Sequence, residues 1–502
     1  MRNLIDLLNR SADQFGDGVA AIYRGDPVSF ANLREMVERF SRALRAIGIG
    51  PGDRVALVMP NCLHSIVCYL GAIRAGAIAV PVNIRLKPEE TRFILGDVGA
   101  RVLVAHERTW PAVSDALEGL ESVEQVLSIG VEAEGVAEVE ALMADPGPAF
   151  EPPEIAPGDV AAIIYTSGTT GLPKGAMLTH ANVLFNVQST IRGHGFRPDD
   201  VHLLIVPLFH VTGLNTIMPT SLFLGSTLVI SAGTNPRALF ELIERHRCTT
   251  VFTVPTTTIM LAAEPSLGDY DLSSLRLIGY SGAPMPVRAI ERLRELFPGV
   301  ALHNFYGLTE STSVTTVLPD EFALSHAESI GRIVPELEAK IADEAGNALP
   351  AGEVGELLVR GPSIFAGYYQ RPEATAEALE PEGWLHTGDK ALMDEDGFIF
   401  LRGRTKEMII VAGENVYPVE VENVLTRHPD IREAAAVGVE HPVLGEVVKA
   451  VVVARPGASL SESDLRRWCS ERLASYKVPQ RVEFRDELPR NPSGKVIKRL
   501  LR

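Results

Sequence analysis

The feature that most constrains this fold is an alternation of short apolar runs with longer helical patterns, beginning at residue 54. Its first part contains RVALVMP, AIAVPVN and RVLVA, with helix-like stretches between them. It resumes at residue 160 with VAAIIY, HLLIVP, TVFTVP, RLIGYSG and ALHNFYG. Strands that are apolar on both faces are typical of parallel sheets covered by helices on both sides. The sequence therefore predicts an α/β fold with doubly wound sheets, which bind ligands where their strands end.

The chain is too long for one ordinary core, because it has 502 residues. Turn-rich β segments begin near residue 340, and a further small unit of strands and helices follows Arg404. We predict a large N-terminal domain, residues 1–403, with a β-rich subdomain at about 335–403. A small, mobile α+β C-terminal domain is expected over residues 404–502, with the boundary between Gly403 and Lys406.

The amino-acid composition limits which ligands and which cellular compartment this protein can have. The formal charge of −17 argues against a general nucleic-acid binder, so any phosphate site must be local. The cysteines Cys62, Cys68, Cys248 and Cys469 form no CxxC pair, which fits a reduced compartment. The N-terminus lacks the pattern of a secretory signal, and the uncharged stretch 201–230 is interrupted by Pro and Gly. We expect a cytoplasmic protein without a transmembrane segment, and a homodimer is compatible with this interpretation.

The loop YTSGTTGLPKG, residues 165–175, follows one of the predicted strands. Its glycines let the backbone curl closely around a ligand, and exposed amide groups in such a loop can cradle a phosphate. It is not a Walker A loop, because Pro173 precedes Lys174 and Gly175 follows it. An ordinary surface turn is the alternative. The composition and position of the loop favour a phosphate site.

This loop resembles the phosphate loop of the adenylate-forming superfamily, which contains acyl-CoA synthetases, luciferases and peptide-synthetase adenylation domains. Further segments resemble the superfamily's motifs in the same order: PLFHVTGL, SGAP, NFYGLTE, GYYQRPEAT, WLHTGD, GRTKEMIIVAGENVYPVEVE and NPSGK. The resemblance implies an AMP-forming ligase. ATP and a carboxylate would give an acyl-adenylate and pyrophosphate, and CoA would then release AMP and form acyl-CoA, with Mg²⁺ as cofactor.

The resemblance also implies roles for residues around ATP. Glu310 would coordinate Mg²⁺ with Thr166 nearby, Thr309 would contact the α-phosphate, and Asp389 would bind the ribose hydroxyls. Without the resemblance, Glu310 would be a solvated carboxylate and Asp389 a turn residue. The other nucleotide-binding residues it implies are Ser167, Gly168, Thr169, Thr170, Gly171, Lys174, Gly282, Ala283, Pro284, Asn304, Phe305, Tyr306, Gly307, Arg404 and Lys495.

The resemblance implies that the second half-reaction needs a different arrangement of the domains. The C-terminal domain would rotate about Lys406, which otherwise would be a merely exposed residue. Lys495 would serve adenylation only, while Gly413 and Glu414 would face CoA afterwards. His210 would lie at the inner end of the pantetheine tunnel, although a buried core histidine is the alternative. The implied catalytic residues are Lys174, His210, Thr309, Glu310 and Lys495.

The acid would bind beside the adenylate, in a pocket of mostly apolar or small residues. Phe305 departs from the glycine of many coumarate-type and fatty acid-type relatives, and we expect its ring to shorten or bend the pocket. We predict a short to medium monocarboxylate that is branched, cyclic or aromatic. A second carboxylate would lack a cationic partner here. The predicted pocket residues are Phe209, Val211, Thr212, Tyr280, Phe305, Ser313 and Val314.

Several alternatives remain at this stage. A long-chain fatty acid-CoA ligase, or an adenylating enzyme that uses an acceptor other than CoA, would share almost every motif. A free-standing chain without a carrier domain fits CoA better than a modular peptide synthetase. An inactive nucleotide-binding scaffold would be expected to have lost Lys174, Glu310 or Lys495, and all three are present.

Overall fold

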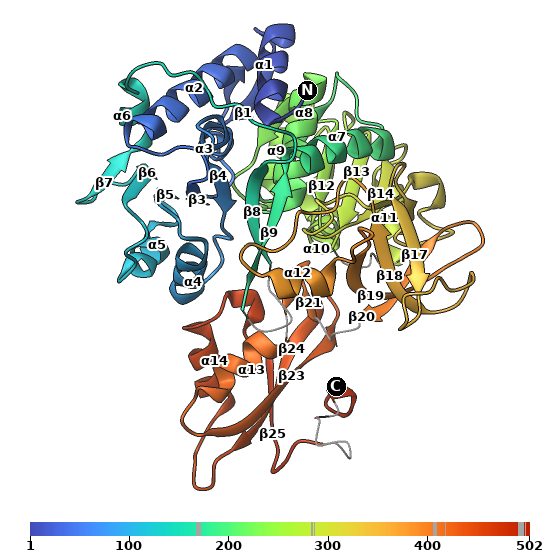
Figure 1. Ribbon diagram of the computed structural model, residues 1–502. Helices are drawn as coiled ribbons and strands as arrows, with labels where there is room; N and C mark the ends of the chain where they lie inside the picture. The colour runs from blue at the N-terminus through green and yellow to red at the C-terminus, as the bar shows by residue number, and fades with distance from the viewer. Residues whose placement is uncertain are drawn as a thin grey trace.

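The computed structural model describes residues 1–166, 172–282, 285, 287–404, 409–416, 418–489, 496 and 498–502. Figure 1 shows the N-terminal part in blue and green, a β-rich part in yellow and orange, and a C-terminal part in red that lies beneath α12 (Pro372–Ala378). This arrangement agrees with the predicted α/β class, with a large N-terminal region and a small C-terminal region.

The N-terminal sheet contains the first apolar runs and has the strand order β7-β6-β5-β3-β4-β8-β9. Its pairs are parallel except β8 with β9, which form the hairpin that carries the glycine-rich loop. The loop residues 167–171 lie outside the described residues. The strand bounds are β3 Arg54–Val58, β4 Ile78–Pro81, β5 Val102–His106, β6 Gln125–Ile129, β7 Val136–Glu138, β8 Val160–Thr166 and β9 Lys174–Thr179.

The central sheet has the order β16-β15-β14-β13-β12-β10-β11-β1-β2. Its middle strands are parallel, and antiparallel strands close both edges, so the predicted parallel sheets are in fact mixed. The strand bounds are β1 Val19–Tyr23, β2 Asp26–Ser29, β10 Val201–Leu204, β11 Thr227–Ile230, β12 Thr250–Thr253, β13 Leu277–Ser281, β14 Ala301–Tyr306, β15 Thr316–Leu318 and β16 Arg332–Ile333.

The β-rich segments form an antiparallel sheet in the order β17-β18-β19-β20, with bounds β17 Glu338–Ala342, β18 Gly355–Arg360, β19 Leu385–Met393 and β20 Ile399–Arg404. The C-terminal sheet has the order β22-β21-β24-β23 with β25 beside β24. Its bounds are β21 Ile409–Val411, β22 Glu414–Val416, β23 Ile431–His441, β24 Gly445–Ala454 and β25 Arg481–Phe484. The C-terminal sheet has a separate hydrophobic cluster of its own, as a small independent core requires.

Helices cover the sheets as the alternation predicts. The first one is capped by Asn3, whose side chain accepts hydrogen bonds from the amides of Ile5 and Asp6. The remaining bounds are α1 Leu4–Phe15, α2 Phe30–Ala46, α3 Leu63–Arg74, α4 Pro88–Val98, α5 Trp110–Leu117, α6 Val139–Ala144, α7 His180–His194, α8 Met218–Leu224, α9 Pro236–His246, α10 Pro255–Ala263, α11 Val287–Leu296, α13 Pro418–Thr426 and α14 Glu462–Ser470.

The uncharged stretch 201–230 folds as β10, a π-helical turn (Thr212–Ile217), α8 and β11. Most of its apolar residues are buried in the protein interior. Among the residues that the structure describes, every helix is too short or too polar to cross a bilayer. The π-helical turn begins two residues after His210, and such turns often mark functional sites.

Candidate functional site

A cavity of about 1020 Å³ lies where the central sheet, the β-rich sheet and the C-terminal domain meet. Its lining comes from the carboxyl ends of β12, β13 and β14 and from the loop after β10, as the rule for parallel sheets predicts. The C-terminal domain contributes residues 412–415 and Lys477. One cavity is therefore lined by groups from both the N-terminal and the C-terminal parts of the chain.

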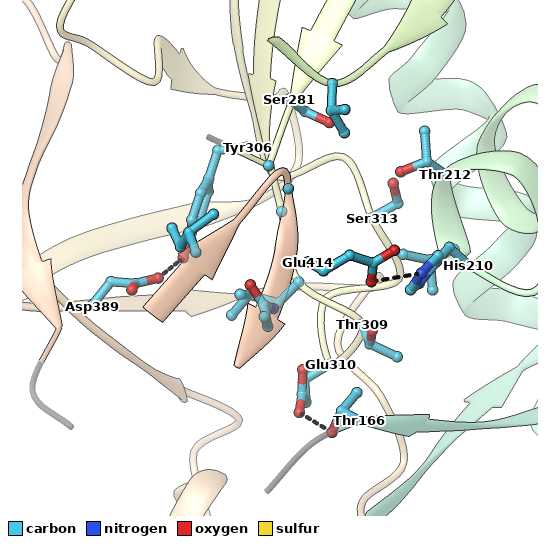
Figure 2. Close-up of a pocket in the computed structure, with 18 of the residues that line it drawn as sticks. Thr166, His210, Thr212, Ser281, Tyr306, Thr309, Glu310, Ser313, Asp389 and Glu414 are labelled. Atoms are coloured by element: carbon cyan, nitrogen blue, oxygen red, sulfur yellow. Dashed lines mark hydrogen bonds and ion pairs between the residues drawn. The ribbon is translucent and has the colours of Figure 1, made fainter. Parts of the chain in front are cut away.

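One corner of the cavity holds the groups assigned to phosphate and metal. Thr166, the last residue of β8, donates a hydrogen bond to Glu310 Oε1 at 3.4 Å, as Figure 2 shows. Lys174 begins β9 on the other side of the loop, and its ammonium lies over the ring of Tyr368, 5.2 Å from the centroid. A carboxylate with a neighbouring hydroxyl fits Mg²⁺, which takes few protein ligands and keeps waters and substrate phosphates.

A second corner holds several of the residues that the sequence predicts to bind the ribose and the base. Asp389 is 1% exposed, and its Oδ2 accepts a hydrogen bond of 2.5 Å from the hydroxyl of Tyr306 (Figure 2). Arg404 lies directly opposite Asp389 in the β19–β20 pair. Asn304, at the end of β14, donates its side-chain amide to the carbonyl oxygen of Ser329 at 3.0 Å. The predicted nucleotide residues of these strands therefore lie close together.

A third corner joins the two domains. Glu414 of β22 pairs with His210 at 3.5 Å, as Figure 2 shows. It also pairs with Arg85 at 2.8 Å, and both partners lie more than two hundred residues earlier in the sequence. Burial raises the pKa of Glu414, but the hydrogen bond and charge of His210 and the charge of Arg85 outweigh burial and leave the pKa below its usual value. His210 lines the cavity, which favours the predicted pocket position over a core histidine.

Two glycines let the backbones approach closely here. A Cβ on Gly413 would lie 2.8 Å from a methyl group of Val254, and its φ of +84° also favours glycine. A Cβ on Gly307 would lie 1.2 Å from the carbonyl oxygen of Ser313. The absence of a side chain at Gly413 therefore lets the C-terminal loop approach Val254 just after β12, whereas Gly307 lets the chain after β14 fold back closely on Ser313.

The structure places only some of the predicted acid-pocket residues on the cavity. Phe209, Val211, Thr212, Phe305 and Ser313 line the cavity. Tyr280 and Val314 pack instead into hydrophobic clusters, Tyr280 in the one beneath β13. Side chains alternate between the two faces of a strand, so Ser281 reaches the cavity while its neighbour Tyr280 turns away.

Phe305 closes off the space behind the pocket. Its side chain is 3% exposed and packs edge-on against His194, with ring centroids 5.3 Å apart, and against Phe252 at 5.7 Å. His194 is buried, and burial together with neighbouring His303 lowers its pKa well below the ordinary value. The aromatic cluster behind Phe305 is therefore uncharged and filled.

Several predicted residues lie outside the described residues: Ser167, Gly168, Thr169, Thr170, Gly171, Ala283, Pro284, Lys406 and Lys495. Other contributors were missed by sequence reasoning. Arg85 lies in no recognised motif, whereas Tyr368 lies inside GYYQRPEAT, and that motif was the signal that could have identified it. Lys477 reaches Glu90 of α4, 387 positions earlier in the chain, and no sequence pattern connects them.

Comparison with known proteins agrees with the geometry. The AMP-binding enzyme model matches residues 8–369, and the model of the AMP-binding enzyme C-terminal domain matches residues 420–495. The chain is 38% identical over 493 residues to a feruloyl-CoA synthase of an Amycolatopsis species, which covers 97% of this chain and 96% of the relative. It also resembles the amide bond synthetase McbA of Marinactinospora thermotolerans, with a TM-score of 0.91, 34% identity, and coverage of 100% and 99%.

A third relative is solved in more than one state. A double mutant of the o-succinylbenzoate CoA synthetase of Bacillus subtilis, bound to a CoA product analogue, gives a TM-score of 0.89. The same enzyme with its acyl-adenylate gives 0.74, although identity (30%) and coverage (100% and 98%) are the same in both. Our structure is therefore more similar to the form bound to the CoA product analogue than to the form with the acyl-adenylate.

A matching family model over most of the chain and full-length relatives above 30% identity lead to one assignment. The chain belongs to the AMP-binding enzyme family, the adenylate-forming acyl-CoA synthetases.

Proposed function

We propose that this protein is an AMP-forming carboxylic acid:CoA ligase that uses Mg²⁺. The observation that carries the proposal is that a single cavity joins the Thr166–Glu310 corner to the interdomain corner of His210 and Glu414. The first corner suits the activation of a carboxylate by ATP. The second suits the arrival of a nucleophile from the direction of the C-terminal domain.

In the first half-reaction, a carboxylate oxygen attacks the α-phosphorus of ATP and pyrophosphate leaves. Lys174 and the loop amides would offset the charge that develops on the phosphate, and Asp389 would orient the ribose. Glu310 and Thr166 would hold Mg²⁺, which supplies charge neutralisation at the phosphates. Lys495 keeps its predicted role of contacting the α-phosphate and the attacking carboxylate.

In the second half-reaction, the thiolate of CoA attacks the acyl carbonyl, and the bond to AMP breaks. The present arrangement supports this step, since Gly413 and Glu414 line the cavity beside His210 and Gly307. The hinge at Lys406, the domain limits 1–403 and 404–502, a homodimer and a cytoplasmic location remain predictions.

The acid class follows from the pocket. Its lining residues Phe209, Val211, Thr212, Phe305 and Ser313 carry no charge, so a free second carboxylate would be desolvated without a cation. Phe305 limits the depth. These features favour a short to medium monocarboxylate that is branched, cyclic or aromatic.

The direct test is a panel of acids with Mg-ATP, each assayed with and without CoA and with a simple amine in place of CoA. We expect CoA-dependent AMP release and a matching thioester by mass spectrometry. Adenylate without thioester would contradict the CoA assignment. An amide product in the amine reaction would favour the acceptor class of the amide bond synthetase relative.

Replacing Glu414 by Gln should separate the half-reactions. The substitution removes the charge that pairs with His210 and Arg85 across the domains, so we expect thioester formation from pre-formed adenylate to slow about tenfold. Acid-dependent pyrophosphate exchange should remain near the wild-type rate. Equal loss in both assays would contradict a role confined to the second step.

The substitution Phe305→Gly tests the pocket. Removing the ring opens a path toward His194 and Phe252, so kcat/KM for acids longer by two or more methylenes should rise about tenfold relative to wild type. The variant should also lose about 3–5 kcal/mol of stability. Val314→Ala is the control, since it removes buried volume outside the cavity lining. An unchanged chain-length preference in Phe305→Gly would disprove the depth argument.

A further inference from the structure

Glu310 is held by a side chain to which the sequence assigned no role. The hydroxyl of Tyr368 donates a hydrogen bond of 2.7 Å to Oε1 of Glu310, the same oxygen that Thr166 approaches at 3.4 Å. In Figure 2 the other carboxylate oxygen of Glu310 points away from Thr166. Two hydroxyls on one oxygen restrict rotation of the carboxylate and so determine where its second oxygen lies.

The backbone of Tyr368 is fixed to the strand that follows the phosphate loop. Tyr368 forms an antiparallel bridge with Ala176 of β9, and its neighbours complete the pairing through Gly367 to Met177 and Tyr369 to Gly175. The amide of Tyr368 also donates to the hydroxyl of Thr375 at 2.9 Å. Because β9 begins at Lys174, the position of the phenol is coupled to the position of the loop lysine.

The ring of Tyr368 contacts two side chains, those of Phe365 and Lys174. Phe365 packs against it with centroids 4.9 Å apart at 76°, and the amide of Phe365 donates to the carbonyl oxygen of Glu310 at 2.9 Å. The Lys174 ammonium lies over the ring at 5.2 Å, within the range of a cation–π contact. Tyr368 therefore touches both groups on which phosphate and metal binding would depend, Glu310 through its hydroxyl and Lys174 through its face.

We propose that Tyr368 is a positioning residue for the adenylation half-reaction: its hydroxyl orients the Glu310 carboxylate toward Mg²⁺ while its ring holds Lys174 beside the phosphates. The inference rests on the proposed function. Partners that orient a metal-binding carboxylate typically change metal affinity or activity by about 10- to 100-fold when they are removed. A phenol suits this task, because it donates one hydrogen bond and adds no charge to the site.

The test uses Tyr368→Phe, which removes the hydroxyl but keeps the ring packing and the contact with Lys174. Tyr369→Phe is the matched control, since the Tyr369 hydroxyl accepts a hydrogen bond of 3.0 Å from the exposed amide of Gln370 rather than donating one to Glu310. Binding of a non-reacting α,β-methylene analogue of ATP is measured by calorimetry, with saturating Mg²⁺ and with EDTA. Circular dichroism and thermal melting verify that each variant folds.

We expect Tyr368→Phe to reduce the Mg²⁺-dependent gain in analogue affinity by at least about tenfold, with binding in EDTA unchanged. Tyr369→Phe should match wild type in both conditions. In the Glu310→Gln background, adding Tyr368→Phe should cost little more, because the hydroxyl acts through the carboxylate. A purely structural role would lower binding equally with and without Mg²⁺.

Three results would overturn the inference: a Mg²⁺-dependent gain in Tyr368→Phe equal to wild type, an equal loss in Tyr369→Phe, or an undiminished loss in the Glu310→Gln background. Failure of the proposed function has a different signature. Wild-type protein would then form no thioester with any acid of the panel, while the calorimetry would still report on Tyr368.

Discussion

Replacing Glu310 by Gln is expected to slow adenylation by about 100- to 1000-fold, the range seen when one preorganised electrostatic group of an active site is lost. The amide keeps the shape of the side chain and an oxygen acceptor for Tyr368 and Thr166, but it removes the negative charge that would hold Mg²⁺ at the phosphates. The measurement is acid-dependent exchange of labelled pyrophosphate into ATP, at several Mg²⁺ concentrations.

The matched control for this prediction is Glu373→Gln, an exposed carboxylate in the first turn of α12. It should stay within about twofold of wild type, because it contacts no part of the cavity. Thioester formation from supplied adenylate should persist in Glu310→Gln if the loss belongs to the first half-reaction. A loss of exchange below tenfold would contradict a metal-binding role for Glu310.

Replacing Lys477 by Met is expected to destabilise the protein by about 3–5 kcal/mol, because it leaves the buried Glu420 carboxylate and the partly buried Glu90 carboxylate without their cation. Lys477 is 2% exposed and pairs with Glu420 at 2.7 Å within its own domain and with Glu90 at 2.8 Å across the interface. Burial would lower the pKa of Lys477, but Glu420, Tyr476 and Glu90 together raise it above its usual value, so the lysine is charged at neutral pH.

Urea denaturation followed by tryptophan fluorescence measures this loss, with Trp468 of α14 reporting on the C-terminal domain. Lys449→Met is the control, since its partner Glu483 is about one third exposed and the pair lies on the same C-terminal sheet. That control should cost about 1 kcal/mol or less. Equal losses of unfolding free energy in the two variants would show that the Glu90–Lys477–Glu420 cluster stabilises the protein no more than a partly exposed ion pair does.

The parts of the site that sequence reasoning located share a physical basis. Asn304 lies in β14 and Glu310 follows that strand, and the parallel pairing of β12, β13 and β14 brings these strand ends together, while Thr166 ends β8 of the N-terminal sheet and lines the same cavity. Once these strands pair in this order, the motif residues at their ends lie close to one another. For the same reason the α/β class and the change to a β-rich region could be predicted from local patterns.

Other assignments needed information that no local pattern holds. Tyr280 and Ser281 are adjacent in sequence and belong to one motif, yet only Ser281 lines the cavity, because the pleat of β13 turns them to opposite faces. A motif identifies the segment, whereas the register of the strand decides the face. The orientation of the Phe305 side chain likewise depends on its packing against His194 and Phe252.

By itself, the sequence determined the α/β architecture and the family resemblance, and it predicted the nucleotide corner, because apolar periodicity and glycine-rich turns act over a few residues. Only the tertiary structure decided how Phe305 packs against His194 and Phe252, the contact of Tyr368 with Glu310, and the interdomain pairs of Glu414 with Arg85 and Lys477 with Glu90. Those contacts join segments separated by tens to hundreds of residues. Their formation depends on how whole sheets and domains pack, and side-chain chemistry alone does not specify that packing.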